Sequence, residues 1–194
     1  DQVGISGITA LTNGNYVVSS SSWDNGATLD AGAVTWGSGT TGVTGIVSAA
    51  NSLVGSTAND QVGISGITAL TNGNYVVNSE LWNNGAATSV GAVTWGSGTM
   101  GVTGTVSASN SLVGSTTSGY FGYVRITALT NGNYVVNNPR WGNGAATEAG
   151  AVTWSSGTTG VTGIVSAANS LVGSTANDQV GISGITALTN GNYV

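Results

Sequence analysis

Short apolar stretches alternate with turns rich in glycine and asparagine along the whole chain. Near the amino end, the apolar stretch 8–11 is followed by Thr-Asn-Gly-Asn and then by Tyr-Val-Val. Asn-Gly is the strongest two-residue signal for a β-hairpin, because a type I′ turn needs positive φ at both central residues. The pattern predicts a hairpin with its turn at Asn13-Gly14, in which Leu11 pairs with Tyr16 and Ala10 with Val17.

The residues after this hairpin predict further strands. A loop over residues 19–31 contains Trp23 and a second Asn-Gly pair, and residues 32–36 form a β-branched and aromatic stretch typical of a strand. Residues 46–48 and 53–56 predict a last strand, or two short ones. Because no stretch of useful length places apolar residues at a helical period, we expect about four strands and no helix.

The whole pattern recurs with a period of 59 residues, which is the spacing of Leu11, Leu70, Leu129 and Leu188. Three repeats are expected at residues 1–59, 60–118 and 119–177, followed by a partial fourth at residues 178–194. The partial repeat is identical in sequence to residues 1–17, so it is expected to form an overhanging hairpin. A fixed period of this length indicates an array of stacked units.

Four antiparallel strands in a repeat of this length are typical of a β-propeller blade. The layout also resembles propeller repeats in which a tight turn leads into a Val-Val strand, and the matching piece here is Asn-Gly-Asn-Tyr-Val-Val-Ser at residues 13–19. A β-solenoid with two rungs per repeat is the alternative, but solenoid strands are mostly parallel and Asn-Gly hairpins favour antiparallel pairing. The sequence therefore predicts an all-β chain of propeller-like blades.

Three blades are fewer than the four to eight of ordinary propellers. Since one unit cannot bury its hydrophobic face alone, the first and last repeats are expected to expose an apolar sheet face. A longer array would cover these faces, and so would association of chains in which the overhang of one adds a hairpin to another. Near-identical units suit extension by length better than a single asymmetric catalytic pocket.

Composition narrows the classes of partner. Two arginines are the only basic residues, against seven acids, so the clustered positive charge needed for nucleic acid or an anionic membrane is missing. The chain has no cysteine or histidine, which excludes thiolate catalysis and cysteine-ligated metals. No apolar run approaches the roughly 20 residues of a membrane helix. A surface of Ser, Thr, Asn and Gly is insensitive to salt and suits extracellular exposure.

Two sets of tryptophans recur once per repeat. Trp36, Trp95 and Trp154 lie on a predicted strand and are expected to pack between blades. The other set lies in loops beside asparagine, and such a pair could stack on a sugar ring and hydrogen-bond its hydroxyl groups. One site per repeat would bind glycans multivalently. The alternative is that these indoles fill a groove between neighbouring blades. The candidate residues are Trp23, Trp82, Trp141, Asn25, Asn84 and Asn143.

The positions of the acidic residues do not predict a catalytic site or a metal site. Glycoside hydrolysis would need two carboxylates held about 5–10 Å apart, and the acids of this chain are isolated in sequence. The regular acidic spacing of calcium loops is also missing. We therefore expect no enzyme activity, no metal and no cofactor. Residues 119–125 depart from the repeat and form either a specific contact patch or a repacked seam, through Tyr120, Phe121, Tyr123 and Arg125.

The phrases LTNGNYVV, GAVTWGSGTTGVTG and VSAANSLVGST resemble a repeat of very large bacterial surface proteins, described as haemagglutinin-like or adhesin-like. The resemblance covers essentially the whole chain. It implies export, a cell-surface or extracellular location, and long arrays. The expected function is a structural array or fibre whose units pack end to end with copies of themselves. A lectin-like adhesin module is the alternative.

Overall fold

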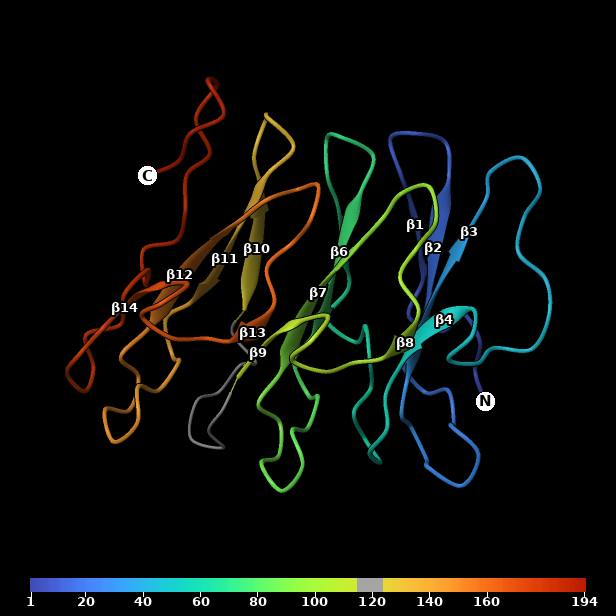
Figure 1. Cartoon of the computed structure of the whole chain (residues 1–194), viewed down its shortest axis with the longest axis horizontal. Helices are drawn as coiled ribbons and strands as arrows, with labels where there is room; N and C mark the ends of the chain where they lie inside the picture. The colour runs from blue at the N-terminus through green and yellow to red at the C-terminus, as the bar shows by residue number, and fades with distance from the viewer. Residues whose placement is uncertain (115–123) are drawn as a thin grey trace.

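The computed structural model describes residues 1–114 and 124–194. Within these ranges every regular element is a β-strand, and the strands form three sheets, one for each full repeat, that lie side by side in a row (Figure 1). No helix in the described ranges could cross a membrane. The sheet of the first repeat contains β1 (Ile8–Ala10), β2 (Tyr16–Ser20), β3 (Ala33–Gly37) and β4 (Ser52–Val54).

The second and third repeats repeat this arrangement. The second contributes β5 (Ile67–Ala69), β6 (Tyr75–Ser79), β7 (Ala92–Gly96), β8 (Gly104–Thr105) and β9 (Leu112–Val113). The third contributes β10 (Arg125–Ala128), β11 (Tyr134–Asn138), β12 (Ala151–Ser155), β13 (Gly163–Ile164) and β14 (Leu171–Val172). The prediction of an all-β chain with about four strands per repeat is confirmed.

Within each repeat the four main strands form an antiparallel meander, as the propeller-blade interpretation expects. Between repeats the pairing is parallel, because β4 pairs with β8 of the second repeat and β9 pairs with β13 of the third. The last part of the second repeat, and that of the third, thus contain two short strands that belong to different sheets. Backbone hydrogen bonds consequently join neighbouring sheets, with Val106 N donating to Val54 O and Val165 N donating to Val113 O.

The predicted register of the Asn-Gly hairpin is wrong by one residue. Ala10 pairs with Tyr16, not with Val17, and the loop is closed by hydrogen bonds from Leu11 N to Asn15 O and from Gly14 N to Leu11 O. Gly14 has a φ of +86°, whereas Asn13 is not among the residues with positive φ, so the turn is not type I′. The geometry is that of a three-residue loop, a type I turn followed by a glycine bulge. One residue of register moves every side chain to the opposite face.

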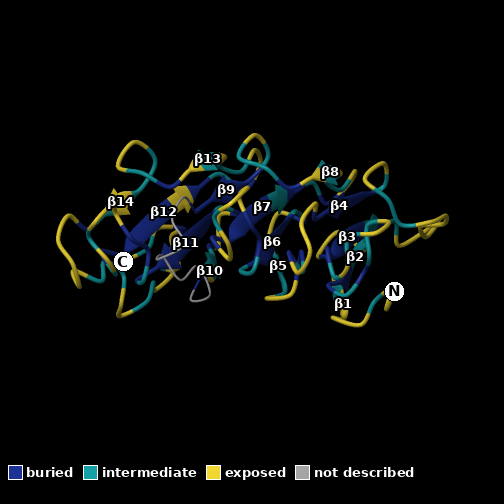
Figure 2. Cartoon of the chain, turned by 90° about the horizontal axis from the view of Figure 1, so that it is seen from below, coloured by how far each residue is buried: buried dark blue, intermediate teal, exposed yellow. Residues whose placement is uncertain are grey.

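The hydrophobic core lies between the sheets. Val17, Val34 and Leu53 of the first repeat pack against Tyr75 and Val77 of the second. Equivalent residues form the next layer between the second and third repeats: Val76, Val93, Leu112, Tyr134 and Val136. The second repeat therefore buries one face of its sheet against the first repeat and the other against the third. Figure 2 shows the buried strands within this row and the exposed loops around it.

The row is open, and the two chain ends lie at opposite ends of it (Figure 1). At the first repeat, Val3 is 63% exposed, although the equivalent Val62 is fully buried. At the third repeat, Leu171 is 69% exposed, although the equivalent Leu53 and Leu112 are fully buried. Both ends thus expose apolar surface that the same residues bury inside the row.

The partial repeat lies on the outer face of the third repeat. Val180, Ile185 and Tyr193 pack against a cluster that includes Val135 and Val152. Its regular pairing is limited to two isolated bridges, Gly150 with Val180 and Ala187 with Tyr193. The partial repeat turns back on itself at the antiparallel bridge between Ala187 and Tyr193, and within the described residues it has no second pair of strands to complete its sheet.

Candidate functional site

The Asn-Gly hairpin of each repeat reaches the next repeat through its side chains. Asn13 Nδ2 and Asn15 Nδ2 both donate to the carbonyl oxygen of Gly98, at 2.8 and 2.7 Å. Trp36 Nε1 donates to the same oxygen at 3.0 Å. One backbone carbonyl of the second repeat is therefore held by three donors of the first. We call the two asparagines and the tryptophan of one repeat the carbonyl clamp.

The carbonyl clamp recurs one repeat later with almost the same geometry. Asn72 Nδ2 and Asn74 Nδ2 donate to Gly157 O, each at 2.8 Å, and Trp95 Nε1 donates to it at 2.9 Å. The recurrence gives a physical reason for the repeated sequence Asn-Gly-Asn, because both asparagines bind the neighbouring repeat. It also accounts for Trp36 and Trp95, which were expected to pack between blades. Trp154, for which the same was expected, is 48% exposed.

The clamped glycine is fixed by its own repeat as well. Gly98 N donates to Asn74 Oδ1 at 2.9 Å, so the amide of this glycine faces its own hairpin. A Cβ atom at Gly98 would overlap the carbonyl oxygen of Gly73. Only glycine therefore allows the two turns to approach closely enough for the Gly98 carbonyl to enter the clamp of the preceding repeat.

A buried carboxylate forms a second link between the first two repeats. Asp60 Oδ2 accepts from Ser56 N at 2.9 Å and Thr57 N at 2.8 Å. Asp60 Oδ1 accepts from Asn83, from the backbone N at 3.0 Å and from Nδ2 at 2.7 Å. The carboxylate is fully buried, and these four donors replace the water that it loses. In the third repeat the equivalent position is Gly119, which lies outside the described residues.

The interfaces also bury two tyrosines, Tyr75 and Tyr134. Burial raises the pKa of both phenols above the usual value of about 10, because the charged phenolate would lose its hydration. Among the residues that the structure describes, neither hydroxyl has a hydrogen-bond partner of good geometry. The two rings contribute apolar area to the core rather than chemistry.

The structure places the loop tryptophans inside the fold. Trp23, Trp82 and Trp141 are only 7%, 4% and 4% exposed, and Trp82 belongs to the core between the first two repeats. Asn25 Nδ2 donates to Gly55 O at 3.0 Å, and Asn143 Nδ2 donates to Gly173 O at 2.9 Å. As these side chains stand, the indole faces are covered, which is what the groove-filling interpretation expects.

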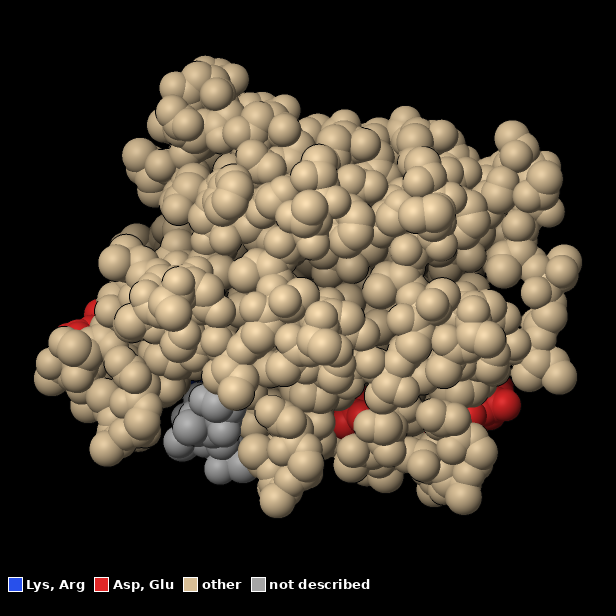
Figure 3. Space-filling model, in the orientation of Figure 1, with Lys and Arg blue, Asp and Glu red and all other residues tan. Residues whose placement is uncertain are grey.

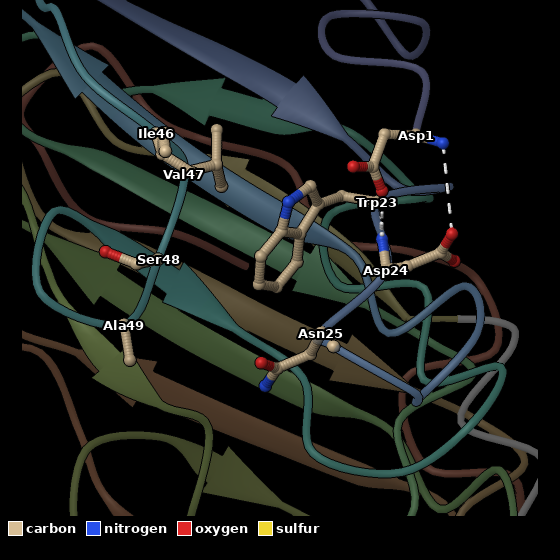
Figure 4. A pocket seen from close by; sticks show the side chains of 9 residues that line it. Asp1, Trp23, Asp24, Asn25, Ile46, Val47, Ser48 and Ala49 are labelled. Carbon is tan, nitrogen blue, oxygen red and sulfur yellow. Dashed lines mark hydrogen bonds and ion pairs between the residues drawn. The ribbon is translucent and has the colours of Figure 1, made fainter.

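Beside Trp23 the first repeat has a pocket of about 480 Å³ that is also lined by Asp24, Asn25 and Val47 (Figure 4). Asp1 forms one wall of it, where its Oδ1 accepts from Asp24 N at 2.9 Å and its amino group lies 3.8 Å from Asp24 Oδ2. The indole of Trp23, although only 7% exposed, is among the groups that line this space. Asn84 and Asn143 of the later repeats form no part of it.

Of the predicted contact patch, Tyr120, Phe121 and Tyr123 lie outside the described residues. Arg125 is exposed at the start of β10, where it pairs with Asn137. In the described ranges no three acidic side chains are grouped so as to hold a metal ion. In the view of Figure 3 the few acids lie apart along one edge of the row.

The profile of one protein family, described as a repeat of unknown function (DUF5650), matches three segments of the chain, at residues 10–64, 69–123 and 128–182. The chain belongs to the DUF5650 repeat family. Each DUF5650 match begins 59 residues after the previous one. The first and third matches end at residues 64 and 182, just past Val62 and Val180, which pack on the preceding repeat, so these two DUF5650 units include part of their own interface. No curated protein and no solved structure matches the chain.

Proposed function

We propose that this protein is a non-enzymatic structural protein whose DUF5650 repeats stack end to end into a stiff, open array. The observation that carries the proposal is the recurrence of the carbonyl clamp, in which three side chains of one repeat hold one carbonyl of the next at both described junctions. An interface that is used again without change extends a structure by one identical step. Repeat arrays of this kind owe their stability to such nearest-neighbour contacts.

The place of action that we propose is a bacterial cell surface or an extracellular fibre. The resemblance of the repeat phrases to large surface proteins supports it, and so does a surface that is almost free of charged side chains (Figure 3). Interfaces made mainly of neutral hydrogen bonds and apolar contacts, with the one charged link at Asp60 fully buried, are little affected by ionic strength. The partners of the array are other repeats of the same kind, with neither nucleic acid nor membrane insertion involved.

Binding of glycans is the second candidate function. The pocket beside Trp23 supports it, because an asparagine, two aspartates and an indole line the same open space. A glycan array probed with the wild-type protein and with Asn25→Ala tests this function. Binding that the substitution reduces would favour the adhesin, and absence of binding would leave the structural role alone.

The structural proposal is tested by the location of the protein on the cell and by the shape of the purified chain in solution. Antibodies against the protein should label intact, unpermeabilised cells of the source bacterium in electron microscopy. Small-angle X-ray scattering of the purified chain should show an elongated particle whose long dimension matches three stacked sheets. Label confined to permeabilised cells, or a compact particle in solution, would overturn the proposal.

A further inference from the structure

We propose that the chain modifies itself at Asn84-Gly85, where the asparagine side chain loses ammonia and becomes aspartate or isoaspartate. The reaction goes beyond the structural function proposed above and needs only water. It follows from three observations: an attacking nitrogen without a hydrogen bond, a side-chain amide without a hydrogen bond, and open space around both. Within the described residues, Asn84 is the one asparagine before a glycine that combines all three.

The reaction is a ring closure between neighbouring residues. The backbone nitrogen of Gly85, after a base has removed its proton, attacks Cγ of Asn84. The new N–Cγ bond forms as the Cγ–Nδ2 bond breaks, and Nδ2 leaves as ammonia. Water then opens the five-membered succinimide at either of its two carbonyls, which gives aspartate or isoaspartate. One amide and one water thus become one carboxylate and one ammonium ion. Glycine favours the closure because it has no Cβ to hinder the ring.

Asn-Gly occurs seven times in the chain, in two structural settings. Four copies form the hairpin turns, and in each of these the glycine nitrogen donates to the carbonyl of the hairpin leucine at 3.1 Å. A nitrogen whose proton is held in this way is harder to deprotonate. The other three copies lie in the loops that lead into β3, β7 and β12. Their glycine nitrogens have no acceptor in the described part of the chain: Gly26, Gly85 and Gly144.

The three loop copies share the sequence Asn-Gly-Ala but differ in the state of the side-chain amide. Asn25 Nδ2 donates to Gly55 O at 3.0 Å, and Asn143 Nδ2 donates to Gly173 O at 2.9 Å. The side chain of Asn84 has no partner among the residues that the structure describes. Ring closure turns Cγ toward the next nitrogen, so Asn25 and Asn143 must first break their hydrogen bonds, whereas Asn84 can turn at once.

The surroundings of Asn84 leave room for the ring. Asn84 and Gly85 are both exposed. Gly85 has a φ of +60°, and apart from its chain neighbours no atom lies within 4 Å of the position that a Cβ would take. Two backbone hydrogen bonds hold the turn, from Asn84 N to Ala87 O at 2.9 Å and from Ala87 N to Asn84 O at 3.1 Å. Neither uses the attacking nitrogen or the leaving amide, so both reacting groups are open to water.

The isoaspartate product weakens a link between repeats. In isoaspartate the former side chain becomes part of the backbone, so the path from residue 84 to residue 85 gains one atom. The turn then cannot keep both hydrogen bonds between Asn84 and Ala87. The preceding residue, Asn83, binds the buried carboxylate of Asp60 through its backbone N and its Nδ2. Modification at Asn84 therefore loosens the hold on Asp60, which links the first two repeats.

The effect on stability has a matched control in Asn84→Asp, which has the mass and charge of the isoaspartate product but no extra backbone atom. Chain that carries isoaspartate at residue 84, isolated by ion exchange, should have a Tm about 2–4 °C below that of Asn84→Asp. Equal Tm values would show that the product leaves the Asp60 link intact, and would overturn that part of the inference.

Incubation of the folded chain at pH 8.5 and 37 °C tests the reaction itself. Chymotrypsin cuts after Trp23, Trp82 and Trp141, so each loop copy lies in its own peptide, and fragmentation by electron transfer distinguishes isoaspartate from aspartate. We expect Asn84 to react about fivefold faster than Asn25 and Asn143, because one hydrogen bond must break first at those two sites. Gly85→Ala should slow the reaction at Asn84 alone.

In concentrated urea, where the hydrogen bonds of the fold are lost, the three loop asparagines should react at similar rates. Equal rates in the folded chain, or a faster reaction at Asn25 or Asn143, would overturn the inference. The same preference for Asn84 in urea would also overturn it, because the local sequence and not the fold would then select the site.

Discussion

The carbonyl clamp can be tested with one isosteric substitution and its equivalent one repeat later. Asn74→Asp keeps the oxygen that accepts from Gly98 N and replaces the Nδ2 donor with a second, negatively charged oxygen facing Gly157 O. Asn133→Asp makes the same change in the third repeat. There the accepting oxygen is also kept, with Gly157 N at 3.0 Å, but the lost Nδ2 has no acceptor in the described residues.

The two variants should therefore differ in the free energy of unfolding. Loss of a partly buried hydrogen bond, together with repulsion between carboxylate and carbonyl, costs about 1–3 kcal/mol for Asn74→Asp. Asn133→Asp changes the environment of an open end and should cost less than about 0.5 kcal/mol. For a chain of this size, a loss of 2 kcal/mol lowers the Tm by about 4–8 °C.

Calorimetry gives the Tm of each variant, and hydrogen exchange measured by mass spectrometry shows which part of the chain has lost stability. Exchange in Asn74→Asp should rise on both sides of the junction between the second and third repeats, and the first repeat should change less. Equal unfolding midpoints for the two variants would refute the reasoning that the clamp stabilises the chain by binding the carbonyl of the neighbouring repeat.

Three further predictions follow from the buried groups at the interfaces. Asp60→Ala leaves Ser56, Thr57 and Asn83 without their acceptor and should lower the free energy of unfolding in urea by about 2–4 kcal/mol. Asp178→Ala removes the acceptor of only two donors, Ser174 N and Thr175 N, and should lower it by about half as much. Equal losses for the two variants would contradict the account. Because the pKa values of Tyr75 and Tyr134 are raised in the folded state, the unfolded chain loses these protons first, so stability should be constant below about pH 10 and fall above it, by up to about 1.4 kcal/mol per pH unit for each tyrosine. Tyr75→Phe should make that fall less steep in unfolding curves taken from pH 8 to 11.5, and an unchanged slope would show that the phenol titrates as in the unfolded chain. Gly98→Ala should loosen the junction on both of its sides, since the added Cβ meets the Gly73 carbonyl, and a Tm within 1–2 °C of the wild type would speak against the close approach of the two turns.

The strands and the period could be predicted from the sequence, because both depend on local signals. Val-Val and Val-Thr-Trp between Gly-rich turns indicate strands in any context, and identical phrases fix the spacing. The hairpin register could not be predicted from the turn residues alone. Asn13 and Asn15 are used to bind the next repeat, and the three-residue loop that places them there competes with the two-residue turn that Asn-Gly ordinarily favours.

The contacts between neighbouring repeats could not be predicted from sequence patterns. Gly98 lies more than 80 residues from Asn13 and Asn15, and nothing local says that a glycine carbonyl will receive their amides. The recurrence of Asn-Gly-Asn together with Gly-Ser-Gly, which becomes Ser-Ser-Gly in the third repeat, was the available signal. Both sequences were interpreted only as turns. The loop tryptophans left two interpretations open for a similar reason, because the same Trp-Asn pattern fits a sugar site and a filled groove, and burial distinguishes them only once the neighbouring repeat is placed.

The central claim, that the repeats form an open row through identical steps, can be measured by distances between equivalent positions. The chain contains no cysteine, so pairs of cysteines can be introduced for spin labels at the exposed turn positions Thr41, Met100 and Thr159. Pulsed electron–electron double resonance should give similar distances for the label pairs 41–100 and 100–159, and about twice that distance for the pair 41–159. Three equal distances would mean that the repeats close into a ring, and that result would contradict the account.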